Sequence, residues 1–368
     1  MLIAPDTFKG SLSAPEAAEA IASAARLAWP DAEVDLMPLA DGGEGTLAVL
    51  SSAGATLTTT RVTDPVHRAL NASWAIHNGR AIVESAEASG LGHVVPTPST
   101  AANACTCGTG ALLREAVDRG LRDIVLTVGG TATTDGGSGV LRSLGARFLD
   151  EDGKDLPCGG ATLSTLDRID FIGLPEALAD VRLSVATDVD SPLLGSRGAA
   201  AVYGPQKGAT PETVAALDRG LRRLHEVLLR QTGVETDVPG SGAGGGIPAA
   251  LLPLDAAVGS GADLLLDVIG FDQAAATADL VVTGEGSLDD QTLTGKLVCS
   301  VAARSPVPVV AVAGRVTLSP AALHAAGIRQ AEALVTHAGS ASAAVDKAAH
   351  WTTVAAQALF ARYQPVPR

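Results

Sequence analysis

Short apolar runs alternate with longer stretches of helical periodicity near both ends of the chain. Residues 1–6 (MLIAPD) and 34–40 (VDLMPLA) predict buried strands, and a capping box at 13–16 (SAPE) opens a helix between them. Three apolar segments towards the other end also predict strands, with helices between and after them: 278–284, 308–314 and 331–339. This alternation of strand and helix indicates a parallel sheet of the α/β class.

The middle of the chain has shorter elements. Residues 73–79 and 80–85 predict a hairpin whose turn is Asn78-Gly79. A helix is expected to begin at Thr210-Pro211, and residues 238–248 (VPGSGAGGGIP) predict a flexible loop after it. We therefore predict two α/β domains, a parallel-sheet domain built from both chain ends and a second domain inserted in the middle: 1–64 plus 273–368, and 65–272.

Composition narrows the class of protein. A chain of 368 residues with 46% hydrophobic residues can bury a large core. The net charge of −14 argues against a nucleic-acid or anionic-membrane binder, because no basic stripe is present to neutralise phosphates. The four cysteines fit neither a disulfide framework nor the spacing of a zinc site. With no targeting sequence and no apolar run of membrane-spanning length, we expect a cytoplasmic enzyme.

Four loops that follow apolar strands carry acidic residues, and all but the third combine them with glycine: 41–46 (DGGEGT), 129–137 (GGTATTDGG), 188–191 (DVDS) and 284–292 (GEGSLDDQT). Open α/β sheets bind ligands at the carboxyl ends of their strands, where glycine lets backbone N–H groups approach an anion. Carboxylates beside a phosphate repel it unless they hold a cation, and Mg²⁺ resolves that conflict. The alternative, a turn closed by a helix-capping Asp, explains one loop equally well but explains four together poorly.

Lysine is rare, which makes its positions informative. Only five of the 26 basic residues are lysine, and Lys9, Lys207 and Lys296 each adjoin glycine in a loop. A compact ammonium in such a loop suits a phosphate, although an ordinary surface position is the alternative for each.

Several familiar catalytic motifs are absent from the sequence. It has no G-x-x-x-x-G-K-[ST], H-E-x-x-H, G-x-S-x-G or H-R-D motif. Residues 240–245 match G-x-G-x-x-G, but no strand precedes them, so we regard this match as false. The remaining candidates are glycine-rich loops, lysines and carboxylates. These residues suit phosphoryl transfer by positioning and electrostatics, with an Asp as base for a hydroxyl acceptor. The residues alone support Mg²⁺-dependent phosphate chemistry or phosphate binding.

Six segments, taken in order, resemble the motifs of the bacterial glycerate kinase family: IAPDTFKGSLSA (3–14), PLADGGEGT (38–46), GGTATTDGG (129–137), TDVDSPL (187–193), YGPQKGAT (203–210) and TGEGSLDDQT followed by GK (283–296). The resemblance implies an ATP-dependent kinase of D-glycerate that makes 2-phosphoglycerate. It also implies a flavodoxin-like domain built from both termini, an inserted domain of restriction-endonuclease-like topology, and an active site in the cleft between them.

The sequence departs from this family pattern in several places. Thr131 and Thr134 replace a Ser and an Asn, and Ser191 replaces the usual Asn before Pro192. A basic stretch common before the family's Gly-Thr-Gly motif reads TPSTAA at 97–102, and the Glu that often follows the motif is Ala111. These losses leave open how the substrate carboxylate or a phosphate is held, but not the type of reaction.

We assign roles as hypotheses for ATP, Mg²⁺ and D-glycerate. Four residues are expected to be catalytic: Asp188, Asp190, Lys9 and Asp41. Substrate or phosphate contacts are expected from Ser11, Lys207, Lys296, Gly129, Gly130, Asp135, Gly136, Gly137, Glu285, Gln291 and Thr292. The metal is expected at Asp188, Asp190 and Asp289, with Glu44 as a further contact.

Three alternatives stay open: a kinase of another short hydroxy acid, a kinase that forms 3-phosphoglycerate, and a non-catalytic sugar-acid sensor. The expected partners are small molecules and not nucleic acid or membrane, and the chain is expected to be a monomer or a homodimer.

Overall fold

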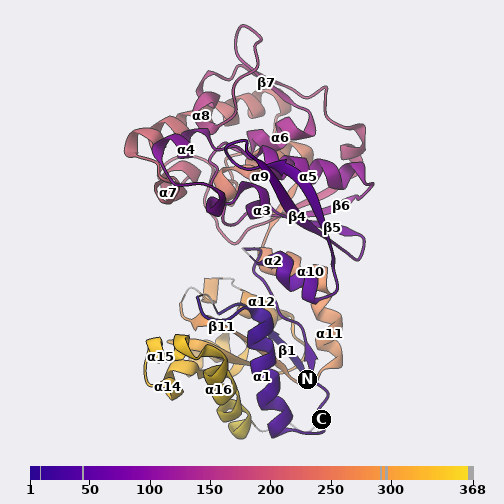
Figure 1. The fold of residues 1–368 in the computed structure, drawn as a ribbon, viewed down its shortest axis with the longest axis vertical. Helices are drawn as coiled ribbons and strands as arrows, with labels where there is room; N and C mark the ends of the chain where they lie inside the picture. The colour runs from indigo at the N-terminus through magenta and orange to yellow at the C-terminus, as the bar shows by residue number, and fades with distance from the viewer. Residues whose placement is uncertain (9, 44, 291, 295–296, 364–368) are drawn as a thin grey trace. The chain divides into compact units, whose positions relative to one another are not determined.

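The computed structural model describes residues 1–8, 10–43, 45–290, 292–294 and 297–363 (Figure 1). The chain forms two compact units. Unit 1 comprises Met1–Asp41, Ala48–Gly54 and Leu265–Arg368, and unit 2 comprises Gly42–Leu47 and Ala55–Leu264. Both units combine a sheet with helices, which confirms the predicted α/β class.

Unit 1 has a five-stranded parallel sheet in the order β13-β12-β11-β1-β2. Its strands are β1 (Leu2–Pro5), β2 (Asp35–Leu36), β11 (Val281–Leu288), β12 (Val309–Val316) and β13 (Ile328–Ala333). Numbered within the unit, this order is the 2-1-3-4-5 arrangement of flavodoxin-like folds. The amino-terminal strand therefore lies inside a sheet whose other side comes from the carboxyl-terminal part of the chain.

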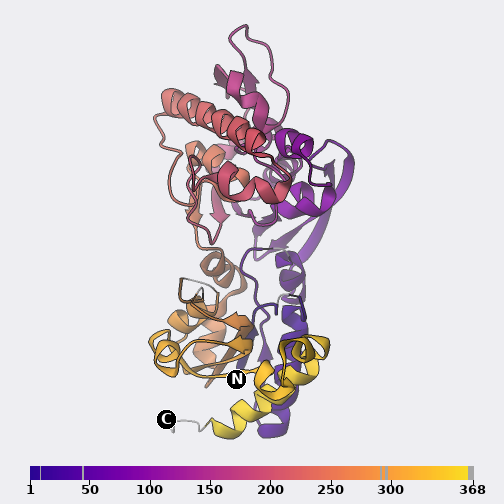
Figure 2. The same ribbon diagram turned by 90° about the vertical axis from the view of Figure 1, so that its left-hand side faces the viewer.

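Alternate residues of β12 pack against different helix layers. Val310 and Val312 belong to the core under α1 (Ala14–Ala28) and α16 (Ala348–Arg362). Ala311 and Ala313 face the opposite core, which includes residues of α12 (Leu297–Arg304) and α13 (Pro320–Ala325). Figure 2 shows α16 in yellow beside α1 in indigo. Because side chains of a strand alternate between faces, a continuous apolar run such as that of β12 fits a sheet covered on both sides.

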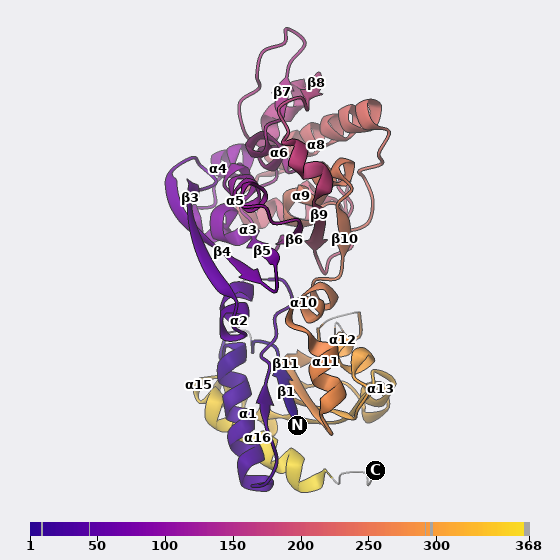
Figure 3. The same cartoon turned by 90° about the vertical axis from the view of Figure 1, so that its right-hand side faces the viewer.

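Unit 2 has a six-stranded mixed sheet in the order β10-β9-β6-β5-β4-β3, which Figure 3 shows. Its strands are β3 (Thr56–Thr63), β4 (Ala69–His77), β5 (Arg80–Glu84), β6 (Asp123–Thr127), β9 (Arg182–Ala186) and β10 (Ala257–Gly259). The predicted hairpin is confirmed: β4 and β5 are antiparallel, and Asn78 and Gly79 take the positive φ values of 51° and 79° that a two-residue turn needs. From β5 to β10 the strands are parallel.

Helices and a small second sheet complete the described structure. The other α-helices are α2 (Thr46–Ser52), α3 (Ser85–Ser89), α4 (Pro98–Asn103), α5 (Cys107–Asp118), α6 (Ser138–Leu144), α7 (Ala199–Tyr203), α8 (Pro211–Thr232), α9 (Ile247–Leu251), α10 (Gly261–Ile269), α11 (Phe271–Thr277), α14 (Leu334–Ala338) and α15 (Ala341–Asp346). The second sheet pairs β7 (Arg147–Leu149) with β8 (Arg168–Asp170). None of the helices described is long and apolar enough to span a membrane.

Two predicted elements are confirmed by their caps. Ser13 and Glu16 form the predicted capping box of α1, with the Ser13 side chain accepting from the Glu16 N–H. Thr210 caps α8 as expected, and its side chain accepts from the Thr213 N–H. Such caps satisfy backbone N–H groups that the first turn of a helix leaves without partners.

Other expectations were wrong in their bounds. The strand predicted at 34–40 is only Asp35–Leu36. Met37 and Leu39 still donate to the Ile3 and Pro5 carbonyls, but Pro5 offers no N–H in return. The segment 331–339 is strand only to Ala333 and then becomes α14, an ambiguity typical of short apolar runs. Residues 284–288, predicted as loop, continue β11 and pair with β12. Finally, β3 lies within the range predicted for the first domain, but it pairs with β4 in the six-stranded sheet of unit 2. The boundaries of the two predicted domains remain a prediction.

Candidate active site

The carboxyl ends of the parallel strands of unit 2 meet at one edge of its sheet. Here the loop that contains residues 42–47 lies against the sheet: a Cβ at Gly42 would be 3.5 Å from the Gly261 Cα and 3.8 Å from the Ala186 Cβ. A Cβ at Gly129 would be 3.3 Å from the Gly43 Cα. Gly42 has φ of 87°, which favours glycine, and the backbones of Gly129 and Gly43 approach closely. Parts of three predicted motifs, Gly42 with Gly43, Gly129, and Asp188, are neighbours at this edge.

Glu84, at the end of β5, is a buried acid that the sequence prediction missed. It is 3% exposed, and its carboxylate accepts hydrogen bonds of 3.2 Å from the N–H groups of Gly45 and Leu47. Both donors lie at the start of α2, where backbone N–H groups lack helical partners. The signal was present in the sequence, because Glu84 follows an apolar strand just as Asp6 and Asp188 do.

Asp188 lies just beyond β9 and is exposed, as are Val189 and Asp190. Its Oδ1 accepts a hydrogen bond of 2.9 Å from the Gly261 N–H and a longer one, 3.5 Å, from the Ser260 hydroxyl. These donors begin α10, which follows the neighbouring strand β10. The Gly261 N–H thus fixes the Asp188 carboxylate at the sheet edge while the residue stays exposed, an arrangement that suits contact with a cation or a hydroxyl group.

The loop at 129–137 divides into two parts. Gly129 and Gly130 are exposed, whereas residues 131–137 are buried. A Cβ at Gly136 would lie 2.3 Å from the Leu224 Cδ2 atom, so this part of the loop packs against α8. Only the exposed glycines offer backbone to a ligand in this conformation.

In the buried part of the loop, the carboxylate of Asp135 accepts backbone hydrogen bonds where the sequence predicted a bound phosphate. It is fully buried, and its Oδ2 accepts from the Thr106 N–H at 2.9 Å, the Thr106 hydroxyl at 2.8 Å and the Gly139 N–H at 3.1 Å, while Oδ1 accepts from the Gly137 N–H at 3.2 Å. Of the predicted cradle, the Gly137 N–H therefore binds a carboxylate of the protein itself, and the Gly136 N–H donates to the Gly245 carbonyl. This geometry favours a structural role for Asp135 over the predicted substrate contact.

Lys207 supports the same loop from the other side. It is 4% exposed, and its ammonium donates a hydrogen bond of 2.6 Å to the Thr133 carbonyl oxygen. Burial lowers the pKa of Lys207 from 10.5 to about 8, partly opposed by the negative charge of Asp135. The lysine thus contacts the protein rather than solvent, which favours loop support over the predicted phosphate contact.

The glycine-rich segment at 238–248 is a packed element, so the prediction of a flexible loop was wrong. Residues 240–243 and 245–250 are buried. The Gly245 carbonyl accepts a hydrogen bond from the Gly136 N–H at 3.0 Å, and the Gly242 N–H donates to the Ser191 carbonyl at 3.0 Å. A single segment therefore fixes both the 129–137 loop and the loop after Asp188.

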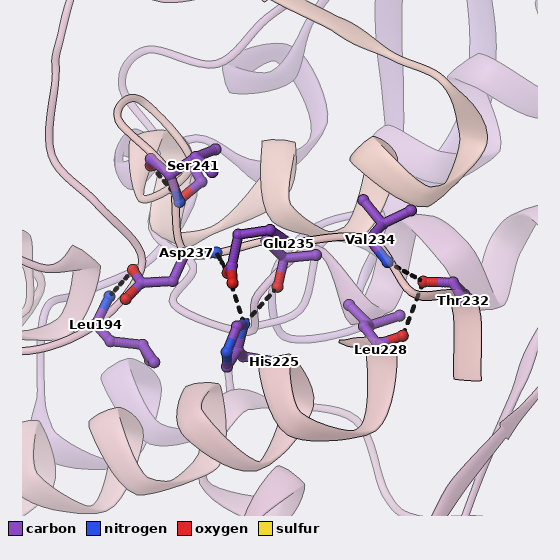
Figure 4. A network of polar contacts seen from close by, with 10 residues as sticks. Leu194, His225, Leu228, Thr232, Val234, Glu235, Asp237 and Ser241 are labelled. Atoms are coloured by element: carbon purple, nitrogen blue, oxygen red, sulfur yellow. Dashed lines mark hydrogen bonds and ion pairs between the residues drawn. The ribbon is translucent and has the colours of Figure 1, made fainter. Parts of the chain in front are cut away.

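Figure 4 shows how the beginning of this segment is held. Asp237 Oδ1 accepts from the Leu194 N–H at 3.1 Å, and the Ser241 hydroxyl donates to the Val238 carbonyl at 2.6 Å. His225 of α8 contacts Glu235, with Nδ1 and Oε1 separated by 3.4 Å. This histidine therefore serves the packing of the segment.

Unit 1 has its own acidic groups at the carboxyl ends of its strands. Asp6, after β1, is 5% exposed and accepts from the Thr7 N–H at 2.6 Å. Glu285, within β11, is 9% exposed, and its Oε1 accepts from the buried hydroxyl of Thr292 at 2.8 Å. Thr292 in turn accepts from the Asp289 N–H at 3.1 Å. The structure thus brings three predicted residues, Glu285, Asp289 and Thr292, into one hydrogen-bonded group.

The other predicted residues of unit 1 are less informative. The Ser11 hydroxyl donates to the Phe8 carbonyl at 2.9 Å within a tight turn. Asp41 is partly exposed at the boundary of the unit. Lys9, Glu44, Gln291 and Lys296 lie outside the described residues.

Comparisons with known proteins identify the class. The sequence pattern of the glycerate kinase family matches residues 1–364. A glycerate kinase from Halalkalibacterium halodurans is 40% identical, with 91% of this chain and 90% of that protein covered. The glycerate 2-kinase of Escherichia coli is 39% identical, with 92% and 91% covered. A solved structure of a provisionally assigned glycerate kinase 2 from Salmonella typhimurium LT2 superposes with a TM-score of 0.85 at 38% identity, covering 98% of this chain and 96% of that one.

These matches define a kinase, that is, a phosphotransferase with an alcohol group as acceptor and ATP as co-substrate. The chain belongs to the glycerate kinase family. The resemblance carried by the six sequence motifs is thereby confirmed. The roles of individual residues stay predictions. The buried positions of Asp135 and Lys207 favour structural roles for these two over substrate contacts.

Proposed function

We propose that this protein transfers the γ-phosphoryl group of ATP to the 2-hydroxyl of D-glycerate and so forms 2-phosphoglycerate. The E. coli relative named for this activity covers nine-tenths of the chain, which supports the substrate and the position. The observation that carries the proposal within the molecule is Asp188, an exposed carboxylate fixed at a sheet edge by the Gly261 N–H.

Asp188 and Asp190 are the proposed base and Mg²⁺ ligand. Both are exposed and follow a strand at the edge where ligands of α/β proteins bind. Mg²⁺ prefers carboxylate oxygen and usually binds through one or two carboxylates, with the remaining positions taken by water and phosphate oxygen. The donor set therefore fits this ion. When bound, Mg²⁺ would neutralise charge that develops on the transferred phosphoryl group.

The remaining residues have supporting roles in the proposal. Gly129 and Gly130 offer exposed backbone at the same edge, while Lys207 and Asp135 keep the loop that follows them in shape. Glu285 and Asp289 are proposed as hydroxyl or metal contacts of unit 1. Lys9 and Lys296 keep their proposed role as phosphate contacts on the basis of the family motifs alone.

A second candidate, a kinase of another short hydroxy acid, is favoured by one observation. The basic stretch common in the family is replaced at 97–102 by TPSTAA, whose first residue, Thr97, caps the short helix α4. A site that loses cations there holds a carboxylate differently, and the preferred acid can change with it.

An ADP-release assay with a panel of acids separates the two candidates. D-Glycerate, tartronate, lactate and threonate are each supplied with ATP and Mg²⁺, and matched samples contain EDTA. We expect turnover to be highest with D-glycerate and to be lost with EDTA. A higher kcat/KM with another acid would replace the proposed substrate, and ligand binding without ATP consumption would indicate a sensor.

A further inference from the structure

Three of the four cysteines gather in unit 2, although Cys158 is more than fifty residues from the other two. The ligand atoms of His67, Cys105 and Cys158 all lie within 4.8 Å of one another. The Sγ atoms of Cys107 and Cys158 are 3.8 Å apart. Cys105 and Cys107 are joined by a disulfide in this structure. We call His67, Cys105, Cys107 and Cys158 the thiol cluster.

The fold brings this cluster together from three separate segments. His67 lies in the turn between β3 and β4 with φ of 65°, a left-handed conformation uncommon for a residue other than glycine. The Cys105 N–H donates a hydrogen bond of 2.9 Å to the Pro65 carbonyl, which ties that turn to the start of α5. A Cβ at Gly159 would lie 2.7 Å from the Asn103 Cα, so the segment after Cys158 also runs close to this point.

The spacing of two of the sulfur atoms, those of Cys107 and Cys158, suits a tetrahedral metal ion. With Zn–S bonds of about 2.3 Å, two thiolates of a tetrahedral site are separated by about 3.8 Å. The Cys107–Cys158 separation already has this value. Three cysteines and one histidine are a common ligand set of structural zinc sites. The spacing of these residues in the sequence does not predict such a site, because Cys158 and His67 join the C-x-C pair only in the folded chain.

The surroundings can stabilise thiolates. The Cys107 N–H donates to the Cys105 Sγ at 3.2 Å, and Cys107 begins the twelve-residue helix α5, whose amino-terminal end favours negative charge. Arg142 is a partly buried cation beside Cys158, and its Nε is buried with no hydrogen-bond partner among the described residues. Burial opposes this effect by raising the pKa of the Cys158 thiol; Arg142 lowers that pKa and Asp135 raises it.

We propose that the reduced thiol cluster binds one Zn²⁺ ion through Cys105, Cys107, Cys158 and His67. A phosphine reductant first cleaves the Cys105–Cys107 disulfide: the phosphine is oxidised to its oxide with an oxygen from water, and both sulfurs become thiols. Metal binding then breaks three S–H bonds, forms three Zn–S bonds and one Zn–N bond, and releases three protons to solvent. The ion itself is neither oxidised nor reduced.

The proposed site is linked to the loop at 129–137 through Thr106. Thr106 stands between the two cysteines of the C-x-C pair, and its N–H and hydroxyl both donate to Asp135. An ion bound at the thiol cluster would hold Thr106 in this position.

Metal titration of the full chain tests the proposal. The protein is reduced with the phosphine, desalted under nitrogen and titrated with Co²⁺, a spectroscopic probe for zinc sites, followed by Zn²⁺. We expect one equivalent of Co²⁺ to bind with the charge-transfer absorption of thiolate ligation, and Zn²⁺ to displace it. Zn²⁺ should also raise the Tm of the reduced protein, because it binds the folded state.

Two variants and one control make the result specific. Cys158→Ser removes a ligand, and His67→Asn removes an exposed one while keeping a residue type that tolerates positive φ. Loss of a residue that merely orients a ligand lowers metal affinity about 10- to 100-fold, so each variant should lose at least about tenfold. Cys299→Ser, in unit 1, changes a partly buried thiol outside the cluster and should bind as the wild type does. Absence of thiolate absorption in the reduced wild type, or unchanged affinity in both variants, overturns the proposal.

Discussion

At the scale of residues, Asp188 and Asp135 both lie in loops that follow strands of unit 2, but their surroundings differ, and we propose different roles for them. Asp135 is fully buried and receives hydrogen bonds on both oxygens from residues of its own unit. Asp188 is exposed, and its Oδ1 accepts a hydrogen bond from the Gly261 N–H. A carboxylate that contacts a substrate must be accessible, so we assign the chemistry to Asp188 and the architecture of the loop to Asp135.

Asp188→Asn should remove catalysis while leaving the fold intact. The amide keeps the size of the side chain and can still accept from the Gly261 N–H, but it cannot take a proton or neutralise Mg²⁺. We expect kcat to fall about 10²- to 10⁴-fold, the usual contribution of a general base, with an unchanged Tm. The measurement is ADP release at saturating D-glycerate. Asp152→Asn, at an exposed surface ion pair with Lys154, is the matched control and should keep full activity. Near-wild-type turnover of the Asp188 variant refutes the assignment.

Lys207 should make stability depend on pH in the alkaline range. Burial lowers the pKa of Lys207 to about 8 in the folded protein, against 10.5 for an exposed lysine. Between these values the unfolded chain binds more protons than the folded one, so the free energy of unfolding contributed by this group rises with pH. Below about pH 8 both states are charged and the full burial penalty applies; above 10.5 both are neutral and it vanishes. The gap corresponds to about 3 kcal/mol.

Denaturant unfolding at pH 7.5 and pH 10 measures this effect. Relative to a Lys207→Met variant, the wild type should gain up to about 3 kcal/mol of unfolding free energy over the range in which Lys207 loses its proton. Lys154→Met, which replaces an exposed lysine, should show no such difference from the wild type. Equal pH dependence of the wild type and the Lys207 variant contradicts the buried, proton-binding lysine.

At the scale of elements, the glycine-rich segment at 238–248 shows how residues without a Cβ allow two backbone segments to pack in direct contact. Gly245 has φ of 78°, and a Cβ there would lie 1.9 Å from the Thr133 carbonyl oxygen. Gly246 similarly faces the backbone of Gly136, with a Cβ-to-Cα distance of 2.7 Å. These contacts allow the segment to hold the 129–137 loop directly through backbone atoms.

Gly245→Ala should therefore destabilise the protein more than backbone strain alone explains. A left-handed alanine costs about 1 to 2 kcal/mol, and overpacking adds about 1 to 3 kcal/mol. Gly233→Ala, at the end of α8, has a similar φ of 73° but nothing within 4 Å of the new Cβ, so it reports the strain alone. Urea unfolding of both variants gives the comparison. Equal losses in the two variants would show that the segment yields to the added methyl group.

Local signals in the sequence predicted the elements that are themselves local. The caps of α1 and α8 and the Asn78-Gly79 hairpin followed from a few adjacent residues. The extension of β11 to Leu288 did not, because pairing with β12 overrides the loop propensity of Gly284–Ser287. The packed segment at 238–248 was missed for a similar reason, since only the folded chain brings Thr133 beside Gly245.

The candidate site follows the same division. Asp188 was found from its place after a strand, whereas Asp6 and Glu84, which also end strands, were assigned no role from the sequence. The burial of Asp135 and Lys207 was not predictable, because it depends on α8 and on Thr106, which are distant in the chain. The thiol cluster required three segments to meet, so the spacing of its cysteines carried no signal.

At the scale of the whole molecule, unit 1 depends on both ends of the chain. β1 lies between β2 and β11 in the sheet, and α1 packs against α16. Each unit has acids at the carboxyl edge of its parallel strands: Asp188 in unit 2, and Asp6 and Glu285 in unit 1. The family membership of residues 1–364 assigns the chain as a whole to one kinase activity.

The most direct test of the account is the identity of the product. Purified protein is incubated with D-glycerate, ATP and Mg²⁺, and the phosphorus NMR spectrum is compared with authentic 2-phosphoglycerate and 3-phosphoglycerate. We predict equimolar formation of ADP and 2-phosphoglycerate. Formation of 3-phosphoglycerate would contradict the proposed position of transfer, and unchanged D-glycerate and ATP would contradict the proposed function itself.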